Sequence, residues 1–240
     1  MAITAKEAKL TPYLTPCYHA RNERYSLALL VHGMDSLTQI DREVSVCTDC
    51  PLSRERNKAV PGEGPENAEV MLIGEAPGSN EDKQGRPFVG AAGNVLQELL
   101  GLGKLRREDV YITNTVKCRP PHNRDPMPGE LAACRKYLDR QIEVISPKVL
   151  VTLGRHALTS FLPNETISKA RGRPRNVNGS TLFPIYHPAA ALYQQSLRKV
   201  IEEDIMKLPA LIEELSSVEE GVPPPADDET ATGGEQLSMF

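Results

Sequence analysis

Four of the five cysteines have a spacing typical of ligands in a metal site. Cys47 and Cys50 form a Cys-x-x-Cys pair, and Cys118 and Cys134 follow, sixteen positions apart. A thioredoxin-like redox pair would stand at a strand-to-helix turn, whereas this pair precedes the first predicted strand. Four thiolates suit a structural zinc ion and a [4Fe–4S] cluster equally well, so the spacing leaves both open. Unrelated buried thiols are the simpler alternative, and Cys17 stands outside the set.

A carboxylate, an amide and an imidazole each stand at the end of a short apolar run. These are Glu75, Asn114 and His187, and a further apolar run, at 148–154, is followed by Arg155 and His156. A buried Asn presents an acceptor and a donor side by side, which matches a pyrimidine edge with a carbonyl and a ring N–H. Simpler interpretations exist, since a strand-end Asn often caps its own turn and a lone His is more often structural. Together the three side chains form a candidate active site.

The segment from residue 74 to residue 93 is rich in Gly and Pro and contains Phe88. It lacks the GxGxxG pattern of a dinucleotide-binding turn. An aromatic ring held in such a loop can stack on a planar ligand, although most Phe side chains belong to a core. Basic residues near the same predicted edge suit a loop that contacts phosphates, or a solvated charged surface. They are Lys83, Arg86, Lys117, Arg119, Arg124, Lys169, Arg171, Arg173 and Arg175.

Strands and helices alternate along the middle of the chain. Apolar runs predict strands at 69–76, 109–116, 148–154 and 181–188, and helical spacing predicts helices at 94–100, 128–145, 155–162 and 197–215. Pro209 should disturb the last helix. The alternation predicts an α/β fold of three α/β/α layers, with a central, mostly parallel four-stranded sheet. Ligands of such sheets bind at the carboxyl ends of the strands, where the side chains above should meet.

The composition is that of a globular protein. The 240 residues are 40% hydrophobic and 25% charged, which excludes a disulfide-dominated mini-protein and a wholly disordered chain. No apolar run approaches the ~18 residues of a membrane span, and the first residues lack the apolar segment of a secretory signal. We therefore expect a cytoplasmic protein without membrane contact.

Charge divides the chain into a body and a tail. Residues 213–240 hold eight acids and no Lys or Arg, so residues 1–212 carry 28 basic residues against 24 acids. We expect an N-terminal extension at 1–33, one folded domain at 34–212 and an acidic disordered tail at 213–240. The mildly basic body permits a polyanionic partner without requiring one.

The chain resembles the iron–sulfur, or family 4, uracil-DNA glycosylases. The resemblance rests on CTDCPLSRERNKAVPGEG (47–64), GEAPGSNEDKQGRPFVGAAGNVL (74–96), ITNTVKCRPPHNRDP (112–126), AACRKYL (132–138) and YHPAA (186–190). It implies a single uracil-DNA glycosylase-like domain in a bacterial or archaeal cell. It also implies a [4Fe–4S] cluster, in preference to zinc, on Cys47, Cys50, Cys118 and Cys134.

The resemblance also implies a role for each candidate residue. Phe88 would stack on a flipped uracil, Asn114 would bind its O4 and N3–H, and His187 would hydrogen-bond O2. Glu75 would orient or activate the attacking water, and backbone N–H groups near Ala76 would help to hold the base. The implied reaction is hydrolysis of the N-glycosidic bond of uracil in single- or double-stranded DNA, which releases uracil and leaves an abasic site. The alternative is a non-catalytic damaged-DNA-binding protein with a structural metal site.

Uracil-containing DNA is the implied partner of a monomeric enzyme. Leu192, which follows three alanines, is the candidate wedge that enters the DNA stack. Residues Gln236–Phe240 resemble the short motif by which bacterial replication proteins bind the sliding clamp, and a frayed tail is the alternative. The basic residues predicted to contact DNA are Lys169, Arg171, Arg173 and Arg175.

Overall fold

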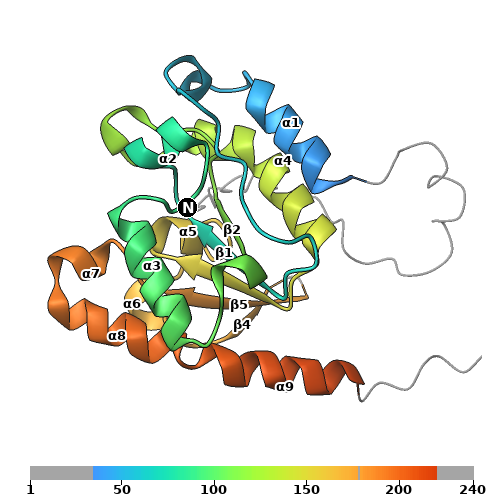
Figure 1. The fold of residues 1–240 in the computed structure, drawn as a ribbon, viewed down its shortest axis with the longest axis vertical. Coiled ribbons are helices and arrows are strands. Elements are labelled where there is room, and N and C mark those ends of the chain that lie inside the picture. The colour runs from blue at the N-terminus through green and yellow to red at the C-terminus, as the bar shows by residue number, and fades with distance from the viewer. Residues whose placement is uncertain (1–34, 178, 221–240) are drawn as a thin grey trace, which may run out of the picture.

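Four buried apolar strands form the parallel part of a five-stranded sheet (Figure 1). The computed structural model describes residues 35–177 and 179–220. The strands are β1 (Val70–Gly74), β2 (Tyr111–Asn114), β3 (Val149–Leu153), β4 (Arg175–Val177) and β5 (Ser180–Ile185). Their order is β2-β1-β3-β5-β4, and only β4 within the described residues runs antiparallel to its neighbour. The α/β class and the four predicted strands are therefore confirmed.

The expectation of only four strands is wrong at one edge of the sheet. The sequence predicts a flexible basic loop that ends at Arg175, but Arg175–Val177 is a strand that pairs with the start of β5 from Ser180 to Leu182. The strand is short and its side chains are exposed or half-exposed. Backbone pairing therefore defines it, and no apolar pattern marks it in the sequence.

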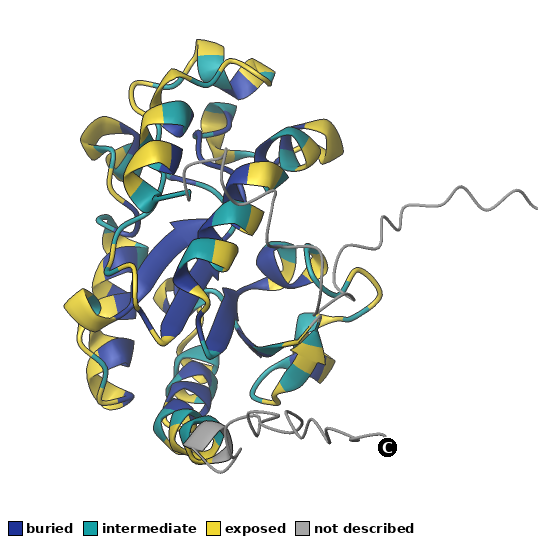
Figure 2. Ribbon diagram, turned by 90° about the vertical axis from the view of Figure 1, so that its right-hand side faces the viewer, coloured by how far each residue is buried: buried dark blue, intermediate teal, exposed yellow. Residues whose placement is uncertain are grey.

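Helices cover both faces of the sheet, which confirms the three layers (Figures 1 and 2). Alternate side chains of the strands enter two cores: β1 sends Val70 and Leu72 to one face and Met71 and Ile73 to the other. The first face packs against α3, α8 and α9, and the second against α4, α5 and α6. The helices are α1 (Leu37–Val46), α2 (Ser79–Gln84), α3 (Ala91–Leu102), α4 (Pro128–Ile145), α5 (Arg155–Thr159), α6 (Ile167–Ala170), α7 (Ala190–Tyr193), α8 (Gln195–Ile205) and α9 (Leu208–Glu220).

The helix expected at 197–215 is two helices. The chain leaves α8 after Ile205 and begins α9 at Leu208, so Pro209 lies in the first turn of a new helix, where its missing N–H removes no helical bond. Helix α9 continues to Glu220, past the boundary expected at residue 212. The predictions for residues 1–33 and for 221–240 lie outside the described residues. Of the helices described, none combines the length and the apolar character that crossing a bilayer requires.

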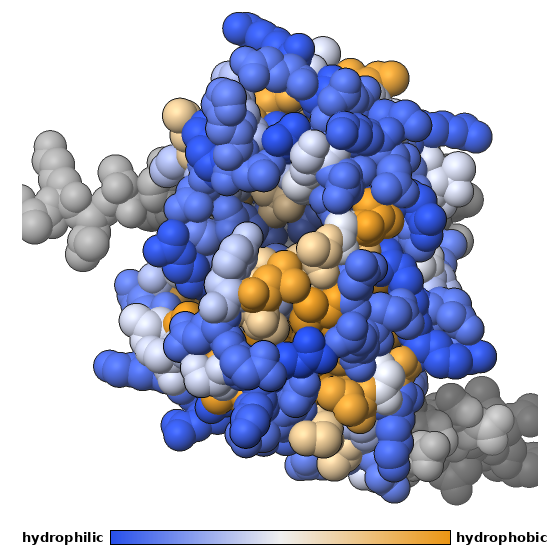
Figure 3. Space-filling model, turned by 60° about the vertical axis from the view of Figure 1, so that its left-hand side comes forward, coloured by the Kyte–Doolittle hydropathy of each residue, from blue (hydrophilic) through white to orange (hydrophobic). Residues whose placement is uncertain are grey.

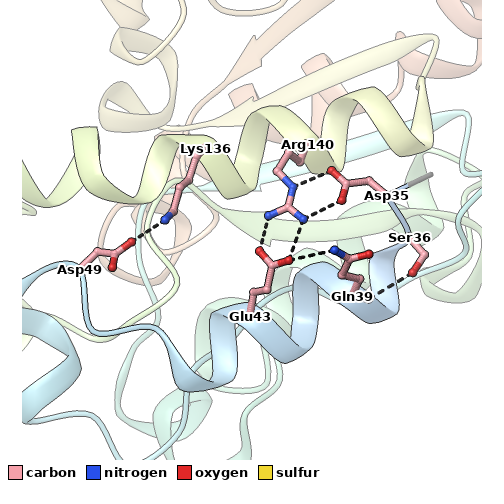
Figure 4. A network of polar contacts seen from close by, with 7 residues as sticks. All are labelled: Asp35, Ser36, Gln39, Glu43, Asp49, Lys136 and Arg140. Atoms are coloured by element: carbon pink, nitrogen blue, oxygen red, sulfur yellow. Dashed lines mark hydrogen bonds and ion pairs between the residues drawn. The ribbon is translucent and has the colours of Figure 1, made fainter. Parts of the chain in front are cut away.

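Charged side chains fasten α1 to α4 (Figure 4). Arg140 of α4 donates two hydrogen bonds to Asp35, at 2.6 and 2.7 Å, and also pairs with Glu43 of α1. Lys136, one turn earlier, donates to Asp49 at 2.5 Å. The Arg140 contacts hold α1, and Asp35 before it, against α4, and the Lys136 contact holds the segment that follows α1.

Candidate active site and four-cysteine centre

The ends of β1 and β2 bring an amide and an aromatic ring to one space. Gly74 pairs with Asn114 in the register of the two strands, and Asn114 is only 2% exposed. A Cβ on Gly74 would lie 2.3 Å from the Asn114 side-chain oxygen and 2.9 Å from the Phe88 ring. The absence of a side chain at Gly74 therefore lets the amide and the ring approach each other.

The Phe88 loop is held in a strained shape by several hydrogen bonds. Phe88 has φ of +50°, a left-handed conformation that costs a non-Gly residue about 1–3 kcal/mol. Arg107 donates to the carbonyl oxygens of Pro87 and Phe88 at 2.6 and 3.1 Å. The next two backbone N–H groups both donate to the Glu81 carboxylate at 2.9 Å. The predicted stacking residue is therefore fixed in place before any ligand binds.

His187 faces the same ring. The imidazole and the Phe88 ring have centroids 5.6 Å apart and planes inclined by 27°. The backbone N–H of Ala189 donates to His187 Nδ1 at 3.1 Å, so the neutral ring carries its proton on Nε2. Burial lowers the pKa of His187 to about 4, which keeps the ring neutral near pH 7. His187 can therefore donate a hydrogen bond without carrying a charge.

Glu75 lies at the same edge, directly after β1. Its backbone carbonyl accepts hydrogen bonds from the Thr115 hydroxyl at 2.7 Å and from the Val116 N–H at 3.1 Å, which ties it to the segment after β2. Burial raises the pKa of its half-buried carboxyl group. The Nε2 atom of His156 lies 3.8 Å from Glu75 Oε2, a contact that the candidate site predicted from the sequence did not include.

The four cysteines predicted as ligands line one small cavity. Cys47 directly follows α1 as its C-cap, and Cys50 comes three residues later. The third thiol, Cys118, comes after β2, and Cys134 lies on α4. All four are free thiols in the described part of the chain.

Hydrogen-bond donors aim at two of these sulfur atoms. Arg56 Nη1 donates to Cys118 Sγ at 3.0 Å, and the backbone N–H of Lys117 donates to Cys134 Sγ at 3.3 Å. Donors of this kind stabilise thiolates rather than thiols. The donor set, the shared cavity and the absence of disulfides among the described cysteines therefore fit a four-thiolate metal centre.

Lys117 does not belong to the basic surface to which its position in the sequence assigned it. Its side chain is 1% exposed. The ammonium group donates to the Thr113 hydroxyl at 2.6 Å, to the Asn114 carbonyl at 2.8 Å and to Gln141 Oε1 at 2.6 Å. Lys117 thus links the backbone of Asn114 to α4, and it is a buried structural residue.

The predicted DNA-binding residues differ in their surroundings. Lys169 and Arg173 are exposed, whereas Arg171 pairs at 2.6 Å with Asp204, whose side chain is 0% exposed. On α7, which follows His187 closely, Leu192 is 45% exposed and Tyr193 is 89% exposed. Figure 3 brings forward the side of the molecule that carries α3 and α7, and it shows apolar side chains gathered among hydrophilic ones.

Comparisons with known proteins agree on one family. Residues 61–208 match the model of the uracil DNA glycosylase superfamily. A type-4 uracil-DNA glycosylase of Sulfurisphaera tokodaii is 52% identical over 73% of this chain and 84% of that protein. The corresponding protein of Saccharolobus solfataricus is 54% identical over 73% of this chain and 86% of its own length. That of Archaeoglobus fulgidus is 48% identical over 73% of this chain and 92% of its own length.

Proposed function

The chain belongs to the uracil-DNA glycosylase superfamily and, within it, to the type-4 enzymes, and we propose that Glu75, Asn114 and His187 carry its reaction. The enzyme hydrolyses the N-glycosidic bond of uracil in DNA, releasing uracil and leaving an abasic site. This membership favours catalysis over the alternative of a protein that only binds damaged DNA. Phe88 and Asn114 meet at the bare backbone of Gly74, and His187 faces the same Phe88 ring. This arrangement is the observation that carries our assignment of the site.

Substrate recognition follows from the chemistry of these groups. The uracil nucleotide leaves the helix stack, which costs a few kcal/mol and costs less at a U·G mismatch. The extruded base stacks on Phe88, and the Asn114 amide binds O4 and N3–H. Backbone N–H groups near Ala76 help to hold the base. Cytosine is rejected because its amine and unprotonated N3 oppose the amide pattern.

Bond cleavage depends on the charge that develops on uracil. The C1′–N1 bond breaks, and its electron pair leaves with the base. The neutral His187 ring donates its Nε2–H to O2, where the negative charge develops. Water attacks C1′ to form the new C–O bond, and its proton passes to the Glu75 carboxylate.

Single-turnover uracil release tests the assignment. The Asn114→Ala and His187→Ala variants should each lower the rate about 100-fold or more, because each removes a group that acts on the departing base. Alkaline scission of a labelled uracil-containing strand measures the abasic product. The exposed Asn164→Ala variant is the matched control. Wild-type rates in both site variants would show that the site lies elsewhere.

The four cysteines are proposed to hold a [4Fe–4S] cluster, with zinc as the alternative. When bound, the cluster would join the segment after α1, the segment after β2 and α4 through four covalent bonds, so its role is structural. Purified protein with a broad visible absorption band and about four iron atoms per chain supports the cluster. Colourless protein that contains zinc contradicts it.

A DNA interface is proposed on the side of the molecule where the candidate active site lies, at the carboxyl ends of the parallel strands. The phosphate contacts come from Lys169, Arg173 and Arg175, whereas Arg171 is engaged by Asp204. Leu192 is the wedge, supported by its exposure on the short helix that follows His187. The enzyme is expected to act as a monomer.

The C-terminal residues Gln236–Phe240 are proposed to bind the sliding clamp. Their support is the sequence alone, since they lie outside the described residues. A Gln followed by apolar residues after a Pro- and acid-rich stretch suits a peptide that docks in an apolar pocket. Binding of the full chain to purified clamp should be lost when these five residues are deleted, with uracil release unchanged. Equal clamp binding by both chains would contradict this proposal.

A further inference from the structure

A histidine and an aspartate from two other segments surround the Glu75 carboxylate. His156 lies in the first turn of α5, and its Nε2 atom is 3.8 Å from Glu75 Oε2 and 3.1 Å from Asp125 Oδ2. One ligand atom from each of Glu75, Asp125 and His156 lies within 4.8 Å of the other two. Arg155 closes the group, because its guanidinium donates to Asp125 at 3.0 Å and to His156 Nε2 at 2.9 Å.

The fold itself creates this group. Strand β3 pairs with β1 in parallel, so the residues that follow the two strands emerge side by side. Gly154, with φ of +88°, turns the chain from β3 directly into α5 and so places His156 beside Glu75. Asp125 comes from the segment before α4, where Arg124 and Glu130 form a two-bonded ion pair at 2.6 and 2.8 Å. The three side chains therefore come from elements that are each fixed independently.

We propose that His156 is a positioning residue for Glu75, and that Asp125 fixes the imidazole in turn. The proposal rests on the role assigned to Glu75 in the proposed function. In its protonated form the imidazole no longer accepts from Arg155, its Nε2–H faces Asp125, and its positive charge attracts the Glu75 carboxylate 3.8 Å away. This attraction holds the carboxylate near His156 and favours its ionised form, which is the form that accepts the proton of the attacking water. His156 itself touches neither the base nor C1′.

The electrostatics of the site agree with this role. Burial raises the pKa of Glu75, and a carboxyl group that is protonated cannot act as the base. His156 and Arg155 lower that pKa by charge attraction, and Asp125 raises it. Loss of the His156 contribution should therefore raise the pKa of Glu75 and leave less of the carboxylate ionised in acid.

The test is the pH profile of single-turnover uracil release by the His156→Gln variant. We expect a rate several-fold below wild type near pH 5 and close to it near pH 8, since a higher pKa of Glu75 leaves less of the carboxylate ionised only on the acid side. The His156→Lys variant restores a positive charge and should recover most of the rate at low pH. His122→Gln, the same change at an exposed histidine, is the matched control and should follow wild type.

Two results would overturn the proposal. A loss that is equal at every pH indicates a structural role for His156, and an unchanged profile indicates no role. The Glu75→Gln variant, measured in the same series, distinguishes the proposal about His156 from the proposed role of Glu75 on which it rests. If Glu75→Gln keeps the wild-type rate, the proposed function of Glu75 fails. If Glu75→Gln is inactive while His156→Gln follows wild type, only the inference about His156 fails.

Discussion

Gly74 determines how closely the catalytic groups approach one another. It stands opposite Asn114 in the register of β1 and β2, and the Asn114 side-chain oxygen and the Phe88 ring both lie close to the position that a Cβ would take. Any side chain there would occupy the space between the amide and the ring. Gly74 thus serves the site by having no Cβ, rather than by adopting a special backbone conformation.

The Gly74→Ala variant should lose most of its activity and keep its fold. The added Cβ would lie 2.3 Å from the Asn114 side-chain oxygen, so the amide or the ring must move away from the base. We expect a fall of about 100-fold in kcat/KM for uracil release, as for the loss of one well-placed donor. Far-UV circular dichroism and the melting temperature monitor the fold.

The control for this change is Gly101→Ala in α3, where an added Cβ meets nothing within 4 Å. That variant should be fully active and up to about 1 kcal/mol more stable, because Ala favours a helix over Gly. Wild-type kcat/KM in Gly74→Ala would show that uracil does not bind between Asn114 and Phe88.

Among the elements, the packing of α1 against α4 brings together three of the four cysteines that line the small cavity. Cys47 and Cys50 follow α1, and Cys134 lies on α4. The four thiols therefore stay close together only if the two helices stay packed against each other. Arg140 is the main polar link, because it bonds both Asp35 and Glu43 across the helix pair (Figure 4). The link is partly exposed, so its contribution to folding free energy is modest, about 1 kcal/mol.

The Arg140→Ala variant should lose the proposed [4Fe–4S] cluster faster than wild type. We expect the visible absorption of the purified protein to decay several-fold faster in the presence of an iron chelator, because α1, which precedes Cys47 and Cys50, separates from α4 more often. Arg135→Ala is the matched control, since Arg135 pairs with Asp139 on its own helix and not with α1. Equal decay in both variants would show that the helix link does not protect the centre.

The sequence predicts those parts of the site that depend on local pattern. Asn114 ends β2, and Glu75 and His187 follow β1 and β5 within two residues. These strands are recognisable from apolar runs, and parallel strands bring their ends to one edge. Phe88 stands out because Gly and Pro surround it. The roles of these residues came from the family resemblance, and the pattern supplied their location.

Other features depend on contacts between distant segments, which no local pattern encodes. Lys117 follows Asn114 by three positions, and the sequence around it suggests an exposed charge. Its side chain is nevertheless buried, and one of its three acceptors is Gln141 of α4. Strand β4 is short and basic, and only its pairing with β5 defines it. Asp125 reaches Glu75 and His156 from a segment whose sequence carries no sign of that contact.

Across the whole molecule, charge is divided in a way that suits a DNA enzyme. The chain has a net charge of −4, yet residues 213–240 hold eight acids and no Lys or Arg, so residues 1–212 are mildly basic. Lys169 and Arg173 are exposed beyond β3, on the stretch that leads to β4, while Arg171 between them is turned toward the buried Asp204. One short basic segment thus contains two kinds of residue, one that faces solvent and one that supports the fold.

These two kinds of residue should respond differently to substitution. Replacing both Lys169 and Arg173 by Ala should weaken binding to a uracil-containing duplex and lower the slope of log K against log salt by about 1.5–2, since each phosphate contact contributes about 0.9. The melting temperature should stay near that of wild type, because both side chains are exposed.

The Arg171→Ala variant should instead keep the salt slope and lose about 2 kcal/mol of folding free energy, because Asp204 keeps only its 3.0 Å contact with Lys207. Fluorescence anisotropy across a salt series and thermal unfolding measure the two effects; a salt slope that falls in Arg171→Ala but not in the double variant would move the DNA contact to Arg171.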